Sequence, residues 1–212
     1  MIKIGLDLAV RTVGIAIKQN DGVILYSSYK GKEKDYFKLQ TEVVDWVFDG
    51  IMESLTEDHE LILEGIFTGV NPKAALNAAR TQGAVIDYYH RLIGKYPRIV
   101  TAVSARKNID MAVQIHKAEI QLEIVKRYNL GEVSTNVRGE IIRARNSYEQ
   151  LKTRNRIRLK TASTVLKTRL KKEQKLAKKE MDKTLSKMST QVKKETGLDE
   201  HMADAIVLIG GE

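Results

Sequence analysis

The chain has 212 residues, of which 42% are hydrophobic, and it contains no cysteine. This length can bury one sizeable core, and the lack of cysteine excludes disulfide bonds and thiolate metal sites. No apolar run approaches the roughly 18 residues of a membrane-spanning helix, and the first residues form a strand pattern instead of a signal peptide. We therefore expect a soluble cytoplasmic protein with no membrane partner.

The formal net charge of +9 is concentrated in one segment. Residues 138–183 contain 16 Lys/Arg and 5 Asp/Glu, a local charge of +11, which leaves −2 for the rest of the chain. Such a segment can neutralise DNA phosphates, and the scarcity of aromatic residues, with Tyr148 as the exception, favours backbone contacts over base stacking. A solvated helical pair or a dimerisation element would carry the same charges.

The N-terminal part of the chain reads as a sheet. Residues 2–8, 12–17 and 23–29 are short β-branched apolar runs separated by turn residues, which predicts an antiparallel three-strand meander. Apolar residues at helical spacing over 35–55 predict a helix that crosses back over the meander and leads to a strand ending at Glu64. This connection is of the βαβ type.

Two further elements complete the predicted sheet region. Asn71 followed by Pro72 is an N-cap and first-turn pair, which predicts a second helix reaching about residue 89. Residues 98–103 read as a fifth strand, and Ser104 would cap the helical stretch after it. The sequence therefore predicts an α/β fold with a five-stranded sheet and flanking helices.

The remaining segments read as helical. Residues 110–128 and 139–194 contain few helix breakers, and the second stretch is too polar to be core. The final helix begins near Asp199, its expected N-cap, and Gly210 and Gly211 follow its last turn. We expect a single domain over 1–212 with a basic helical insertion at about 130–195 before the last helix.

Three acidic residues, Asp7, Glu64 and Asp204, stand at the ends of apolar segments that are far apart in sequence. A carboxylate in an apolar strand costs several kcal/mol unless a cation compensates it, and three of them would repel each other if their segments met. Bound divalent metal resolves this conflict. Two ions about 4 Å apart suit phosphodiester hydrolysis, one activating a water and the other stabilising the leaving oxygen. Asp7 is the best candidate to bridge both ions.

Four residues compete for the third position of the metal site: Asp199, Glu200, His201 and Asp204. On a helix, His201 and Asp204 share a face at a spacing of three, and Glu200 and Asp204 share one nearly as well at a spacing of four. An imidazole ligand suits Mn²⁺ better than Mg²⁺, which prefers oxygen. Helical spacing alone leaves both pairs open.

These motifs carry a resemblance to a known family. The stretch from Gly5 to Ile17, GLDLAVRTVGIAI, resembles the first hairpin of the ribonuclease H-like nucleases, with Asp7 as the catalytic acid. Glu64-Gly-Ile-Phe followed by Asn71 is similar to the RuvC-type Holliday junction resolvases, and Ala-Asp-Ala-Ile around Asp204 matches their last catalytic motif. The long basic stretch before the last helix resembles phage-encoded forms.

The resemblance implies a ribonuclease H-like fold and a homodimer that binds a four-way junction or other branched DNA and nicks two strands of like polarity. Some family members carry His three residues before the last Asp, which favours His201 over Glu200. Two Mg²⁺ or Mn²⁺ ions per active site would then be held by Asp7, Glu64, His201 and Asp204.

The resemblance also implies DNA contacts. Phe67 occupies the position of a family aromatic side chain that inserts at the opened junction centre. Arg106 and Lys107 fall near basic residues that the family uses close to the scissile phosphate. Further phosphate contacts are expected from the basic segment, at Arg143, Arg145, Arg154, Arg156, Arg158, Lys171 and Lys172.

Two other classes of function fit the same residues. One is a DNA-binding or architectural protein without catalysis, in which the acids are relics. The other is a related nuclease that acts on RNA–DNA hybrids or at transposon ends, which would not need symmetric dimerisation.

Overall fold

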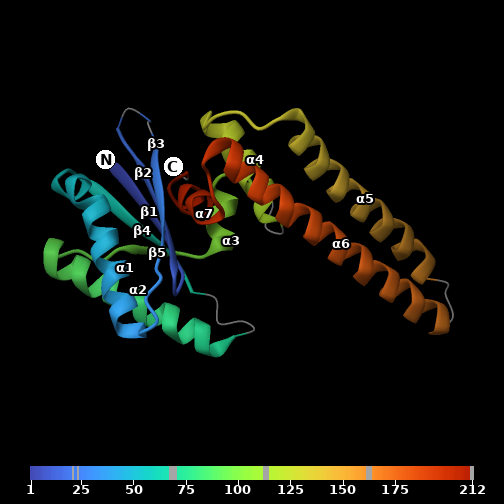
Figure 1. Cartoon of the computed structure of the whole chain (residues 1–212), viewed down its shortest axis with the longest axis horizontal. Helices are drawn as coiled ribbons and strands as arrows, with labels where there is room; N and C mark the ends of the chain where they lie inside the picture. Colours follow the sequence, from blue (N-terminus) through green and yellow to red (C-terminus); the bar gives the residue numbers. More distant parts are fainter. Residues whose placement is uncertain (21, 23, 67–70, 112–114, 161–163, 211–212) are drawn as a thin grey trace. The chain divides into compact units, whose positions relative to one another are not determined.

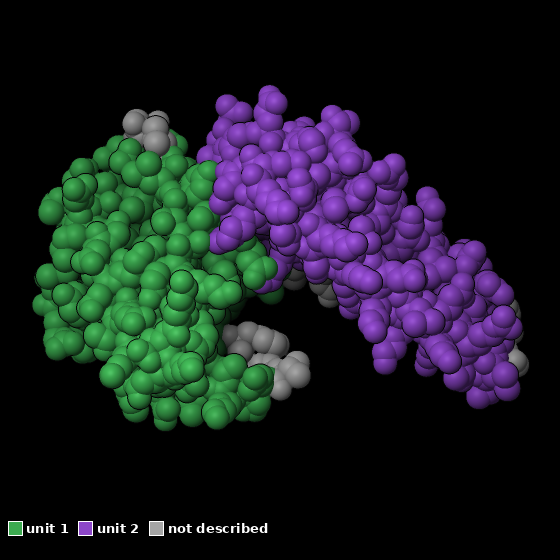
Figure 2. Space-filling view, viewed as in Figure 1, with its two compact units in different colours: residues 1–114, 200–212 green, residues 115–199 purple. Residues whose placement is uncertain are grey.

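The computed structural model describes residues 1–20, 22, 24–66, 71–111, 115–160 and 164–210. The chain divides into two compact units, which Figure 2 colours separately: unit 1 is residues 1–114 and 200–212, and unit 2 is residues 115–199. The prediction of a single domain over 1–212 with an insertion at about 130–195 is not tested by this division and stays a prediction.

Unit 1 contains a five-stranded mixed sheet in the order β3-β2-β1-β4-β5 (Figure 1). Its strands are β1 (Ile2–Leu8), β2 (Thr12–Lys18), β3 (Ile24–Lys30), β4 (His59–Glu64) and β5 (Arg98–Val100). The first three pair antiparallel, whereas β4 pairs parallel with β1 and β5 parallel with β4. The predicted meander and five-stranded mixed sheet are thus confirmed.

Helices flank this sheet. Those of unit 1 are α1 (Tyr36–Ile51), the short 3-10 turn η1 (Met52–Thr56), α2 (Pro72–Ile93), α3 (Ala102–Asn108) and α7 (Glu200–Ile209). The side chain of Asn71 caps α2, with Pro72 in the first turn, as predicted. This helix runs past the predicted end at residue 89 because its left-handed C-cap, Gly94, comes later.

Side chains of β1 alternate between the two faces of the sheet. Ile4 and Leu6 pack into an apolar core with Leu39 of α1. A Cβ at Gly5 would instead meet Ala205 of α7. Figure 1 likewise shows α1 and α2 on one side of the sheet and α7 on the other. Asp7 shares the face of Gly5 and therefore lies on the α7 side.

Unit 2 consists of α4 (Lys117–Tyr128), α5 (Thr135–Leu159) and α6 (Thr164–Thr196). Ser134, at the start of α5, donates from its main-chain N–H to Glu195, near the end of α6, at 2.8 Å. This bond lowers the pKa of the Glu195 carboxyl. Asn155, near the end of α5, bonds Leu170, near the start of α6. The two long helices therefore pack antiparallel.

A narrow apolar seam holds α6 in place. Its buried residues are Leu170, Met181, Leu185 and Val192. Three of them, Leu170, Met181 and Val192, recur every 11 residues, which complete three helical turns. The prediction that this stretch is too polar for the core is wrong at these positions, because four buried apolar residues in a helix of 33 residues are too sparse to stand out among charges.

Three predicted boundaries are corrected. The fifth strand ends at Val100, not at residue 103, and Thr101 caps α3 in place of Ser104, whose main-chain N–H donates to the Thr101 hydroxyl. The fourth helix begins at Lys117, not at residue 110, because His116 and Glu119 form a capping box there. The predicted helical stretch 139–194 corresponds to α5, which begins earlier at Thr135, and α6, and the last helix begins at Glu200, in line with its predicted start near Asp199.

No helix in the described part of the chain is both long and apolar enough to span a membrane.

Candidate active site

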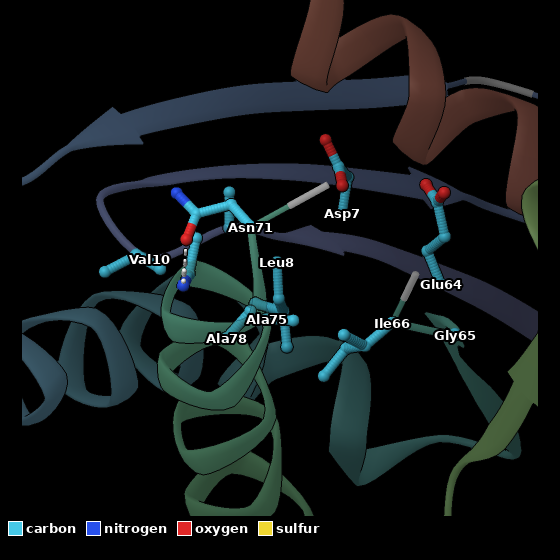
Figure 3. A pocket seen from close by; sticks show the side chains of 11 residues that line it. Asp7, Leu8, Val10, Glu64, Gly65, Ile66, Asn71, Ala75 and Ala78 are labelled. Carbon is cyan, nitrogen blue, oxygen red and sulfur yellow. Dashed lines mark hydrogen bonds between the residues drawn. The ribbon is translucent and has the colours of Figure 1, made fainter. Parts of the chain in front are cut away.

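Asp7 and Glu64 come from neighbouring parallel strands. The register pairs Leu6 of β1 with Leu63 of β4, so the two acids occupy the next position on each strand. Leu63 belongs to the core on the α1 side, and alternation therefore directs Glu64 to the α7 side, like Asp7. Figure 3 shows both carboxylates pointing the same way from the two strands.

Helix α7 brings His201 and Asp204 to the same face. His201 Nδ1 lies 2.6 Å from Asp7 Oδ2, and because an ionised carboxylate only accepts, the ring donates this hydrogen bond. His201 Nε2 lies 3.6 Å from a carboxylate oxygen of Glu200. Asp204, three residues along the helix, lies 3.8 Å from the Arg106 guanidinium, and both of these side chains are mostly buried.

Two glycines allow α7 to lie close to the sheet. Gly14 is the cross-strand partner of Asp7, and a Cβ there would overlap the main-chain carbonyl of His201. A Cβ at Gly5 would overlap the carbonyl of Ala205. Glycine inside a strand weakens it and marks the close approach of another backbone. Sequence reasoning missed both positions, although an interior strand glycine is a readable signal.

A cavity of about 290 Å³ opens at the carboxyl ends of β1 and β4 (Figure 3). Its acidic residues are Asp7 and Glu64, and the first turns of α2 form part of its wall with Asn71, Ala74, Ala75 and Ala78. The three alanines share one helical face, and their small side chains leave the cavity open on this side.

The donor types suit a divalent metal. Three carboxylates and one imidazole offer oxygen and nitrogen ligands of the kind that Mn²⁺ accepts, and the carboxylates alone suit Mg²⁺. As placed, however, no three His, Asp or Glu side chains of the described ranges are grouped so that they could hold a metal ion. His201 donates to Asp7, and Arg106 pairs with Asp204, so protein partners engage these carboxylates.

The other predicted site residues lie in different places. Lys107 is exposed in the last turn of α3, next to Arg106. Phe67 lies outside the described residues. Asp199 accepts a hydrogen bond from Lys193 Nζ at 3.1 Å, and its role as an N-cap stays a prediction.

The predicted phosphate-binding residues of unit 2 fall into two groups. Arg145 lies 3.8 Å from Glu119 and 3.7 Å from Glu149, and Arg154 lies 3.0 Å from Glu173, so acidic neighbours partly neutralise these two. The other side chains are exposed: Arg143, Arg156, Arg158, Lys171 and Lys172. Sequence reasoning did not separate the groups, because Arg154 and Glu173 are brought together only by the pairing of α5 with α6.

No protein-family model matches the chain, and no curated protein matches it. Among solved structures, Thermus thermophilus RuvC in complex with a Holliday junction substrate matches with a TM-score of 0.51 and 14% identity, over 63% of this chain and 82% of that chain. A second structure of T. thermophilus RuvC gives a TM-score of 0.49 and 13% identity, over 63% of this chain and 84% of that chain. At this identity the first match shows the fold: the chain has a ribonuclease H-like α/β fold.

Proposed function

We propose that the chain is a metal-dependent endonuclease that binds four-way and other branched DNA and resolves it by paired symmetric nicks. One observation carries the proposal: Asp7 and Glu64 line one cavity at the carboxyl ends of β1 and β4, and α7 brings His201 to Asp7 on the same face. Functional sites of open α/β sheets commonly lie at this end of the strands.

Asp7, Glu64, His201 and Asp204 would hold the Mg²⁺ or Mn²⁺ ions, two per site. The bound ions would activate a water for attack on the phosphodiester and stabilise the leaving oxygen. His201 would supply the single nitrogen ligand. Arg106, already beside Asp204, has a guanidinium whose planar donors suit a phosphate oxygen, so it would orient the scissile phosphate.

Charge supports a division of labour between the two units. Residues 115–199 contain 22 Lys/Arg and 10 Asp/Glu, a formal charge of +12, whereas the other residues contain 14 and 17, a charge of −3. Unit 2 would therefore provide most of the contacts to DNA phosphates. In a homodimer, each of the two active sites would cut one strand of the junction.

The proposal is tested by cleavage of a synthetic four-way junction against a linear duplex of the same sequence, in Mg²⁺ and in Mn²⁺. We expect symmetric nicks in the junction, little cleavage of the duplex, and a mass by light scattering of twice 24.0 kDa. Junction binding without cleavage in either metal would favour the non-catalytic DNA-binding protein. Cleavage of RNA–DNA hybrids by a monomer would favour the related ribonuclease H-like nuclease.

A further inference from the structure

A side chain of α2 holds the backbone of Glu64. Gln82 Nε2 donates to the main-chain carbonyl of Glu64 at 2.7 Å, and Gln82 is only 8% exposed. The main-chain N–H of Gly65 donates to the carbonyl of Val100 in β5 at 2.8 Å. Both polar atoms of the peptide group that links Glu64 to Gly65 are therefore engaged, one from a helix and one from a neighbouring strand.

This peptide group lies where the ladder between β1 and β4 has ended, although β5 still pairs on the other side. The pairs between β1 and β4 end at Leu6 and Leu63, so Glu64 is at the last position of its strand. A buried main-chain carbonyl without a donor is costly, and side chains commonly provide one where a ladder ends. Gln82 is that donor here.

The same helix face that walls the cavity carries Gln82. Ala75 and Ala78 line the cavity, and Gln82 follows Ala78 by one turn, at spacing four. The first turns of α2 thus border the cavity, and the next turn fixes the strand end from which one of the acids projects.

We propose that Gln82 is a positioning residue for Glu64, an inference that rests on the proposed function. A carboxylate that holds a metal ion must be placed to within about 0.5 Å, and glutamate reaches its ligand through several rotatable bonds. Anchoring the backbone at both ends of one peptide group restricts where the Glu64 carboxylate can lie relative to Asp7. Loss of an outer partner of this kind costs about 10- to 100-fold in metal affinity or activity.

Gln82→Met tests this, because Met keeps the length of the side chain and removes the donor. Tyr36→Phe is the matched control: it removes an equally short bond, 2.7 Å, from the Tyr36 hydroxyl to the carbonyl of Asn77 in α2, together with a 3.3 Å contact to the Thr81 hydroxyl, and neither involves the Glu64–Gly65 peptide group. For the full-length variants, thermal unfolding, Mn²⁺ binding by calorimetry without DNA, and single-turnover cleavage of the four-way junction are measured.

We expect both variants to lower the unfolding midpoint to a similar extent. Only Gln82→Met should weaken Mn²⁺ binding, by about 10- to 100-fold, and slow cleavage at limiting Mn²⁺. Gln82→Glu sets a carboxylate against the Glu64 carbonyl. It should bind Mn²⁺ more weakly and cleave more slowly than Gln82→Met.

Two results would overturn the inference and leave the proposed function standing. One is wild-type Mn²⁺ affinity and cleavage in Gln82→Met. The other is an equal loss in Gln82→Met and Tyr36→Phe, which would assign the effect to stability alone. A wild-type protein that neither binds Mn²⁺ nor cleaves the junction would instead refute the proposed function, and the inference with it.

Discussion

Unit 1 buries a continuous apolar core on the α1 side of its sheet and places Asp7 and Glu64 on the other face, where Asp7 hydrogen-bonds His201 of α7. Unit 2 buries only narrow seams between long helices and carries a formal charge of +12. Reacting atoms need positions fixed by close packing, whereas a polyanion can be held by charges whose exact positions matter less. Substitutions in unit 1 should therefore change rates, and those in unit 2 should change affinity.

Among substitutions that leave Asp7 in place, the largest expected effect is that of Gly14→Ala in unit 1. The added methyl would overlap the carbonyl of His201, so α7 must move away from Asp7. We expect a loss of about 1–3 kcal/mol in the free energy of unfolding and at least about 100-fold in cleavage rate, with junction binding retained. Chemical denaturation and single-turnover cleavage measure the two effects.

Gly83→Ala is the control for this change. Gly83 lies inside α2, and a Cβ there would meet no atom within 4 Å. This variant should gain about 0.5–1 kcal/mol from helix propensity and cleave normally. Normal cleavage by Gly14→Ala as well would show that the approach of α7 to the sheet does not set the site.

His201→Asp should have the next largest effect, because it sets a carboxylate against that of Asp7 in place of the 2.6 Å hydrogen bond. In the presence of a metal chelator, the free energy of unfolding of the variant should fall by about 1–2 kcal/mol, and added Mg²⁺ should restore it. Its cleavage should shift from Mn²⁺ toward Mg²⁺, since an oxygen ligand suits the harder ion. Unfolding and cleavage in each metal provide the readout. An unchanged metal profile would point to Glu200 or Asp199 as the ligand.

In unit 2, changing Arg143, Arg156 and Arg158 together to Ala should remove about three phosphate contacts. The slope of log affinity against log salt should fall by roughly 2–3, with little change in the ratio of junction to duplex affinity. Binding titrations at several salt concentrations measure this slope. Arg154→Ala is the contrast, because it breaks the bond to Glu173. It should lower the free energy of unfolding and leave the salt slope close to that of the wild type. A monomeric triple variant would assign these arginines to the dimer interface.

The smallest effect is expected from Asn155→Leu. Asn155 has 0% exposure, and its Oδ1 has no hydrogen-bond partner among the described residues, while both bonds from its Nδ2 are long, at 3.4 Å. An apolar side chain should therefore add about 1 kcal/mol to the stability of the helical pair, at the cost of register specificity. Denaturant unfolding would detect this gain, and a loss of stability would instead show that the Nδ2 bonds fix the pair.

Features whose signals are local in the sequence were predicted, and features that depend on tertiary packing were missed. The alternating strands of the meander and the cap at Asn71 are short-range patterns, and the structure confirms them. The approach of Asp7 to Glu64 was predictable because adjacent parallel strands end at one edge. Gly14 and Gln82 were missed because their partners, His201 and Glu64, are set by tertiary packing. No pattern within ten residues shows either contact.

The most direct test of the division between the units is the single-turnover cleavage rate of a four-way junction at saturating protein, for the wild type, for Asp7→Asn and for the triple Arg variant. Asp7→Asn removes a carboxylate that would hold metal and would lie near the DNA phosphate, so this variant should bind the junction at least as tightly and never cleave it. The triple Arg variant should need more protein to saturate and then reach the wild-type rate. Cleavage by Asp7→Asn, or a triple Arg variant that stays slow when all the junction is bound, would contradict the account.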